Sequence, residues 1–294
     1  MREIDVESWA QFEEQLHTIR EDHLSCINSV YTHVPALLYR GQCDSKWALE
    51  TTLERQLQCI SNSFKANMAV SSYLRFILRV KHQIESLTNQ RWNTRHFPDY
   101  EKWTKERDLT LFLNELSNNI VEYSYMTYLR HNGFPSPLLD WSRSPYIAAY
   151  FAFAGIAKTK PKDRPDTVTI YVYCQSQDGI KTHSHSFDTP YIHTFGPYIQ
   201  THQRHFLQQS QYTVCISLSE KLDEWQYVCH EKVLSLSNSN QDILWKFNIP
   251  SNECLQVLNK LDAFNLNAYS LFSSDESLMV TLAMRELQFT DKDC

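Results

Sequence analysis

The sequence predicts an α+β fold, in which a helical hairpin is inserted into a mixed or antiparallel central sheet. Three observations support this prediction. Runs rich in β-branched and aromatic residues are short, helical periodicity is confined to a few long segments, and no internal repeat or low-complexity linker divides the 294 residues. We therefore expect one domain over residues 1–294, with an N-terminal helix within about 1–30 and a helical insertion over about 60–130.

The helices are predicted from the spacing of apolar residues. Apolar positions recur at helical intervals over 5–22, 63–90 and 107–130. The polar segment 91–106, which contains Pro98, is predicted to be a loop between the last two. The two long helices are therefore expected to pack against each other as a hairpin.

Four short apolar runs predict the strands of the sheet, over 36–39, 167–173, 211–216 and 243–249. The first run delivers Arg40 at its end, which is unusual because an arginine is costly to bury. Residues 175–202 are predicted to be a surface loop. Their four histidines match no common metal-ligand spacing, so no metal is expected: His183, His185, His193 and His202.

The densest turn signals lie in residues 130–145, where Gly133 and three prolines precede an almost uncharged helix. Ser144 can cap that helix, and Pro145 suits its first turn. Alanines in the helix would let it lie close against a sheet: Ala148, Ala149, Ala152 and Ala154. Asp140, Trp141 and Ser142 are then expected on the turn that enters the helix.

Composition argues against several classes of protein. A formal charge of −6 opposes broad contact with a nucleic-acid backbone, although a local basic cleft is compatible with it. With five glycines, the chain has neither a dinucleotide-binding GxGxxG nor a Walker motif, and it also lacks GxSxG and any CxxC pair. The polar amino terminus and the absence of an apolar run of about 18 residues predict a cytoplasmic protein without a membrane partner.

The residues that carry chemistry lie where strands end or helices begin. Arg40, Asp140 and Ser142 are each at such a position, and such ends converge on one rim of a sheet. With His131 and Trp141 they would form a cleft suited to an anionic ligand that carries an aromatic ring, such as a nucleotide. The alternative is a buried Arg40–Asp140 ion pair that only ties two elements together.

Three motifs resemble those of the FRG domain family. The first is an aromatic residue followed by Arg-Gly, here Tyr39-Arg40-Gly41-Gln42. The second, His-x-Gly-x-Pro-Thr-Arg-Leu-Leu-Asp-Trp-Thr, resembles residues 131–142, and the third, Arg-x-x-x-Gln-Gln-Gly-x-Phe, resembles residues 204–212. Pro137 stands where the second motif has Arg, and Ser210 where the third has Gly. The first departure is expected to remove a cation from beside Asp140.

The order of these motifs is similar to that of ADP-ribosyltransferases of the Arg-Ser-Glu type. That resemblance implies an enzyme that uses NAD, either transferring ADP-ribose or hydrolysing NAD, and a role as a toxin or anti-phage defence effector. Arg40 would hold phosphate, and Asp140 or Glu231 would stabilise an oxocarbenium-like transition state, because Gln208, at the third motif, carries no charge. The other implied ligand-binding residues are Tyr39, Gly41, Gln42, His131, Trp141, Ser142, Arg204 and Gln209.

Two alternatives stay open from the sequence. Pro137 and the missing third-motif Glu favour a non-catalytic sensor module that binds a nucleotide or a protein. A toxin that acts on nucleic acid is the second, although the acidic charge fits it poorly. A protein partner or acceptor is compatible with the enzyme and with the sensor.

Overall fold

A mixed β-sheet forms the centre of the structure, a computed structural model that describes residues 1–26, 36–60, 67–118, 120–176, 181, 189–196, 199, 201–235 and 241–289. In this part of the chain the strands are β1 (Arg2–Asp5), β2 (Leu38–Gln42), β3 (Met68–Ala69), β4 (Leu139–Ser142), β5 (Thr167–Ser176), β6 (Tyr191–Thr194), β7 (Ser210–Ser219), β8 (Glu224–Tyr227) and β9 (Gln241–Pro250). Their order is β1-β9-β5-β2-β4-β7-β8-β3, and β6 pairs with β7. Strand β1 runs parallel to β9 and the other pairs are antiparallel, so the predicted α+β class with a mixed sheet is confirmed.

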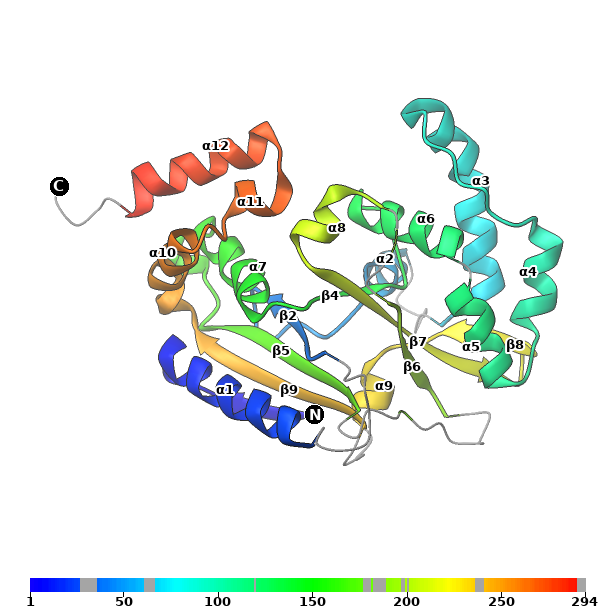
Figure 1. Cartoon of the computed structure of the whole chain (residues 1–294), viewed down its shortest axis with the longest axis horizontal. Coiled ribbons are helices and arrows are strands. Elements are labelled where there is room, and N and C mark those ends of the chain that lie inside the picture. The colour runs from blue at the N-terminus through cyan, green and yellow to red at the C-terminus, as the bar shows by residue number, and fades with distance from the viewer. Residues whose placement is uncertain are drawn as a thin grey trace.

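Helices cover the sheet in two groups, one at each end of the strand order (Figure 1). The α-helices are α1 (Trp9–Cys26), α2 (Thr52–Ile60), α3 (Val70–Thr88), α4 (Phe97–Thr104), α5 (Leu109–Asn118), α6 (Ile120–His131), α7 (Pro145–Ala157), α8 (Gln203–Leu207), α9 (Glu231–Leu234), α10 (Cys254–Ala263), α11 (Ala268–Phe272) and α12 (Asp275–Met284). Short 3-10 turns span Pro161–Asp163 and Ser251–Glu253, and a π-helical turn spans Arg285–Phe289. None of the described helices is long and apolar enough to cross a membrane.

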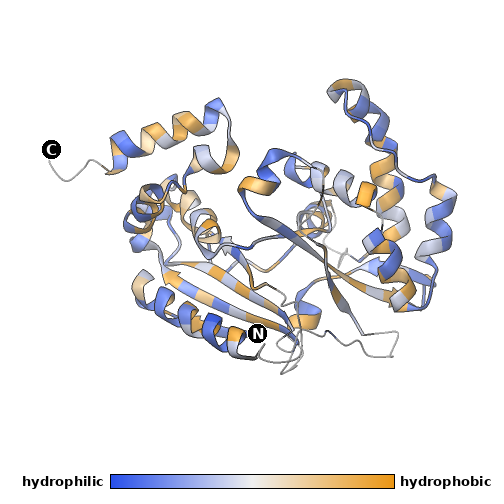
Figure 2. Ribbon diagram, in the orientation of Figure 1, coloured by the Kyte–Doolittle hydropathy of each residue, from blue (hydrophilic) through white to orange (hydrophobic). Residues whose placement is uncertain are grey.

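The first group packs α1, α7 and α10 against the β9-β5-β2 part of the sheet. Strands β5 and β9 pair along almost their whole length, and the ribbon is orange at their hydrophobic residues in Figure 2. From α1, Phe12 meets Phe247 of β9 edge to face at 5.2 Å, and Trp9 meets Phe153 of α7 at 6.3 Å. These contacts form the larger apolar core and fix α7 over β2.

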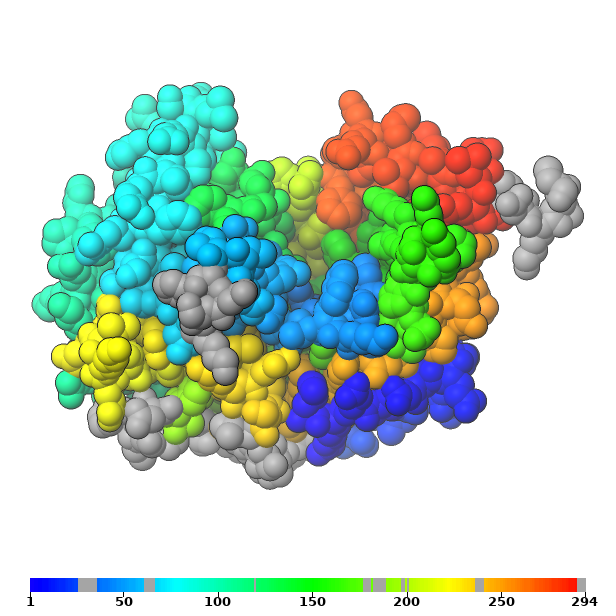
Figure 3. Space-filling model, turned by 180° about the vertical axis from the view of Figure 1, so that it is seen from behind, coloured from blue at the N-terminus to red at the C-terminus, as the bar shows by residue number. Residues whose placement is uncertain are grey.

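The second group is the helical insertion between β2 and β4, which packs on β7 and β8. Tyr73 of α3 lies edge to face with Tyr227 of β8 at 5.7 Å, and the Tyr125 hydroxyl of α6 donates to the Ile77 carbonyl of α3 at 3.1 Å. In the space-filling view from behind, the α3 region and the C-terminal helices form separate protrusions along the upper edge (Figure 3). Helices α3 and α6 of this segment thus pack against each other.

Several predicted boundaries inside the helical parts were wrong. The predicted loop over 91–106 contains α4, because Pro98 lies in the first turn of a helix rather than interrupting one. The helix predicted over 107–130 corresponds to α5 and α6, which lie on either side of residue 119, outside the described residues. The amino-terminal segment begins with strand β1, which ends at Asp5, and its helix starts only at Trp9.

Short strands were also missed. Strand β6 lies within the predicted loop over 175–202 and carries His193, whereas His183 and His185 lie outside the described residues. Strands β1, β3 and β8 have two to four residues each and were not predicted. Such short segments become strands because a neighbouring strand completes their hydrogen bonding, which periodicity alone does not reveal.

The central motif forms a strand rather than the predicted turn. Asp140, Trp141 and Ser142 belong to β4, which pairs with β7 over four residues and with β2 at Tyr39. The prediction for the following helix holds: Pro145 is its first residue, and the Ser144 hydroxyl accepts from the Ile147 N–H at 3.4 Å. Two motifs far apart in sequence thereby lie on adjacent strands beneath α7.

Candidate functional site

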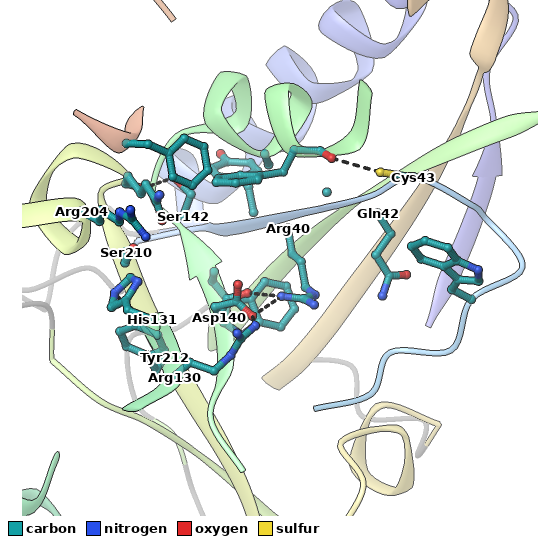
Figure 4. A pocket seen from close by; sticks show the side chains of 18 of the residues that line it. Arg40, Gln42, Cys43, Arg130, His131, Asp140, Ser142, Arg204, Ser210 and Tyr212 are labelled. Atoms are coloured by element: carbon teal, nitrogen blue, oxygen red, sulfur yellow. Dashed lines mark hydrogen bonds and ion pairs between the residues drawn. The ribbon is translucent and has the colours of Figure 1, made fainter. Parts of the chain in front are cut away.

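A pocket of about 310 Å³ lies over β2 and β4, within the range of about 300–1,000 Å³ typical of small-molecule sites (Figure 4). Its walls come from β2, β4, β7 and α7, from the ends of α6, α8 and α11, and from α2 with the turn before it. The lining residues are Tyr39, Arg40, Gly41, Gln42, Cys43, Trp47, Arg55, Arg130, His131, Asp140, Trp141, Ser142, Ala148, Phe151, Arg204, Gln208, Ser210, Tyr212 and Phe272.

The structure brings together ten of the twelve predicted site residues in this pocket: Tyr39, Arg40, Gly41, Gln42, His131, Asp140, Trp141, Ser142, Arg204 and Gln208. The other two do not line it. Gln209 is exposed, in a left-handed conformation with φ of 48°, and its carbonyl accepts from the Arg143 N–H at 3.0 Å. Glu231 begins α9 and accepts a hydrogen bond from the Leu49 N–H at 3.3 Å.

Asp140 lies at the centre of a three-residue ion cluster. Its Oδ1 accepts from Arg40 Nη1 at 2.5 Å and from Arg130 Nη2 at 2.8 Å, and Arg40 Nη1 also donates to the Asp140 carbonyl at 2.8 Å. Burial alone would raise the pKa of Asp140, but the charges of Arg130 and Arg40 outweigh it and hold that pKa well below its usual range. The carboxylate is therefore ionised, and 43% of its side chain stays exposed.

Arg130 corrects the expectation that Pro137 leaves Asp140 without a second cation. Arg130 is in the last turn of α6, next to His131 at the start of the second motif, and its side chain reaches Asp140. The charge of Asp140 raises the pKa of Arg130, so the pair is fully charged. The sequence does show that a cation, Arg130, directly precedes the second motif. It does not show where the Arg130 side chain points, so its contact with Asp140 could not be predicted.

The pocket carries a surplus of positive charge. Arg55 and Arg204 line it together with the two arginines of the ion cluster, whereas Asp140 is the only carboxylate among the described residues that line it. Burial lowers the pKa of Arg55, and the nearby positive charges of Arg40 and Arg130 lower it further. Such crowding of like charges favours an anion that contacts several of them at once.

A neutral pair of side chains forms the wall beside Asp140. Tyr212 Oη lies 2.7 Å from Nε2 of His131, and both residues line the pocket. Burial lowers the pKa of His131 to about 4, against the opposing charge of Asp140, and burial raises the pKa of Tyr212 above its usual value. Neither group carries a charge near neutral pH, so this wall supplies polar contacts without adding to the charge of the arginines.

Ser142, Gln208 and Trp141 brace the pocket from behind. The Ser142 hydroxyl donates to the Gln208 carbonyl at 2.9 Å, and the Gln208 amide donates to the Leu271 carbonyl at 3.2 Å. Trp141 is buried, and its indole N–H donates to the Thr213 hydroxyl at 2.9 Å. These contacts connect β4, β7, α8 and α11, so the side chains hold the walls in place as well as lining them.

Aromatic side chains that the sequence did not single out complete the lining. They are Trp47 before α2, Phe151 on α7 and Phe272 at the end of α11. The Phe151 and Phe272 rings meet edge to face at 6.0 Å, and the Arg204 guanidinium lies 5.5 Å from the Phe272 ring centre. Within the described residues, no group of three or more His, Cys, Asp or Glu side chains could hold a metal ion.

The fold and the site define an α+β protein with an arginine-lined pocket on two neighbouring strands. Residues 35–161 match the model of the FRG domain, a segment that runs from the start of β2 beyond α7 and contains the first two motifs. The resemblance of this segment to the FRG domain is therefore supported. No curated protein and no solved structure matched the chain.

Proposed function

We propose that the pocket binds the pyrophosphate of a nucleotide and that the chain acts on NAD as an ADP-ribosyltransferase-like enzyme. The supporting observation is the pocket lining itself, whose described residues include four arginines and one carboxylate. Guanidinium groups make paired hydrogen bonds to phosphate, and a pyrophosphate offers enough oxygens for more than one of them. Arg40, in the first family motif, is the central phosphate ligand in this proposal.

Asp140 would supply the negative charge for the chemical step. When the bond between nicotinamide and C1′ of the ribose breaks, its electron pair leaves with nicotinamide, and positive charge develops on the ribose. A carboxylate beside that carbon stabilises the charge until water or an acceptor group adds to C1′. Asp140 is ionised and partly exposed in the pocket, whereas Glu231 lies outside it and Gln208 is neutral.

The second candidate function is a sensor that binds a nucleotide without turnover. Its supporting observation is the double ion pair of Asp140, because a carboxylate oxygen that already accepts from two arginines has less charge to offer a substrate. NAD consumption would suit a toxin or an anti-phage effector, whereas binding alone would suit a module that reports nucleotide levels to a protein partner.

The test is to incubate the protein with NAD and measure nicotinamide release, with calorimetry of ADP-ribose binding in parallel. Arg40→Ala should weaken ADP-ribose binding by about tenfold or more, because charge-assisted contacts to phosphate are lost. Asp140→Asn should keep or improve ADP-ribose binding, since a negative charge leaves an anion pocket, yet lower release by about a hundredfold.

Glu231→Gln is the matched control, because it alters a carboxylate outside the pocket and should leave both measurements unchanged. Binding of NAD by the wild-type protein without nicotinamide release would establish the sensor instead. Failure of the wild-type protein to bind either NAD or ADP-ribose would refute both functions.

A further inference from the structure

The pocket has aromatic surface at two ends, on opposite sides of Arg40. Figure 4 shows Arg204 and His131 on one side of Arg40 and Gln42 on the other. Phe272 belongs to the Arg204 end, because the Arg204 guanidinium lies 5.5 Å from its ring. Trp47 belongs to the Gln42 end. The Gln42 amide donates to the carbonyl of Ala48, the residue that follows Trp47, at 3.2 Å.

At the Gln42 end, the backbone holds Trp47 in place although its side chain is open to solvent. Trp47 is 52% exposed, which is high for so large an aromatic residue. Its turn is anchored on β5: the Ser45 N–H donates to the Thr167 carbonyl at 3.1 Å, and the two hydroxyls lie 2.7 Å apart. An exposed indole on a fixed turn at a pocket mouth is a surface on which a planar ring can stack.

At the Arg204 end, Phe272 closes the pocket from the C-terminal part of the chain. Its ring meets Phe151 of α7 edge to face, and the adjacent Leu271 carbonyl accepts from the Gln208 amide. Phe151 and Phe272 are only partly buried, and both line the pocket. A second planar ring can therefore contact apolar surface here while its phosphates reach Arg40 and Arg130.

We infer that the ligand of this pocket is a dinucleotide, with its pyrophosphate at Arg40 and Arg130, one ring on Trp47 and the other at the Phe151–Phe272 pair. This inference rests on the proposed pyrophosphate site and adds the residues that hold the two rings of its ligand. A mononucleotide would leave one aromatic end without a partner. Trp47 and Phe272 are then the residues that select two-ringed ligands, a role separate from phosphate binding.

The test compares three probes: inorganic pyrophosphate, ADP and diadenosine pyrophosphate, which has two rings but no nicotinamide to release. Trp47→Ala and Phe272→Ala should each weaken diadenosine pyrophosphate binding by about tenfold, the scale of losing one stacked base. Neither should change pyrophosphate binding. ADP has one ring and can occupy one ring site at a time. At most one of the two variants should therefore weaken ADP binding by more than about twofold.

Further variants separate loss of stacking from misfolding. Trp47→Phe should recover much of the dinucleotide affinity, whereas Phe272→Leu, which keeps apolar volume without a ring, should behave like Phe272→Ala. Phe264→Ala removes an aromatic ring that is 61% exposed and outside the pocket, so it should bind all three probes as the wild type does.

Two results would overturn the inference. If diadenosine pyrophosphate binds no more tightly than ADP, or if both alanine variants bind it as the wild type does, the two ring sites do not exist, while binding of pyrophosphate would still support the phosphate site. If the wild-type protein binds none of the three probes, the proposed function fails together with the inference.

Discussion

Burial controls the protonation of the site at the level of single residues. His131 lies against Tyr212 and close to the Asp140–Arg130 pair, yet burial keeps its imidazole neutral, with a pKa lowered to about 4. His193 and His230 behave alike, with pKa values lowered by burial to about 4 and about 3. These three histidines bind a proton more readily in the unfolded chain than in the folded protein.

The first prediction follows for stability against pH. The unfolded pKa of His131 is about 6.5, so the unfolded state takes up the proton first as the pH falls, and stability is lost between about pH 6.5 and 4. His131→Gln, which keeps a polar group for Tyr212, should reduce this loss by on the order of 1–3 kcal/mol. Urea unfolding at several pH values across that window measures it.

His17→Gln is the control, because the His17 side chain is 71% exposed, and this variant should follow the wild-type pH profile. Some loss should persist in His131→Gln, since His193 and His230 contribute with the same sign. An unchanged profile in His131→Gln would show that His131 is not held neutral in the folded protein.

Arg40 and Asp140 were predictable as site residues because each stands inside a family motif and at the end of a buried segment. Arg130 was not, although it contributes as directly to the ion cluster. Its role depends on where α6 ends relative to β4, which is a matter of tertiary packing. The prediction from Pro137, that no cation lies beside Asp140, was wrong for the same reason. A cation that approaches Asp140 from another element cannot be predicted from the motif.

At the scale of elements, the contact between β2 and α7 fixes the back of the pocket. A Cβ placed on Gly41 would lie 1.9 Å from the Ala148 carbonyl oxygen and 2.7 Å from the Ala152 nitrogen. The helix backbone therefore lies directly on the strand, as its alanines predicted, and the glycine of the first motif is required by this approach. Arg40, one residue earlier, takes its position from the same contact.

The second prediction is that Gly41→Ala displaces α7. No flexible side chain can yield, because the atoms in the way are helix backbone, so we expect destabilisation of about 3 kcal/mol or more. Thermal or urea unfolding measures it. Gly196→Ala is the matched control, since nothing lies within 4 Å of its Cβ position. A Gly41→Ala protein as stable as the wild type would mean that α7 does not pack on β2 in this way.

Elements were predictable where their pattern is long. Strands β5, β7 and β9 have ten residues each, and their apolar β-rich runs identify them, as helical periodicity identifies α3. The short strands depend on partners distant in sequence, and β4 reads as a turn because its four residues lie between prolines. The pocket lies on β4, which carries the second motif. The motifs therefore predicted where the pocket is, but not its shape, because β4 was not predicted to be a strand.

At the scale of the whole molecule, positive charge is concentrated in the pocket of an acidic chain. The formal net charge is −6, yet the pocket lining, in the part of the chain that the structure describes, has four arginines and one carboxylate. A small anion can contact these arginines alone, whereas a long polyanion is also repelled by the net negative charge of the chain. This distribution favours the proposed nucleotide site over a nucleic-acid groove.

The third prediction uses this separation. Inorganic pyrophosphate should raise the melting temperature of the protein. At a concentration a hundredfold above its dissociation constant, it should add about 2.7 kcal/mol to the free energy of unfolding. Added salt should weaken this stabilisation. A short DNA duplex at the same salt should give no shift in the melting temperature.

Arg55→Ala should reduce the stabilisation by pyrophosphate, because Arg55 lines the pocket. Arg285→Ala should not, because Arg285 pairs with Asp262 outside the pocket. Stabilisation by the duplex but not by pyrophosphate would instead assign the arginines to nucleic-acid binding and support the nucleic-acid toxin.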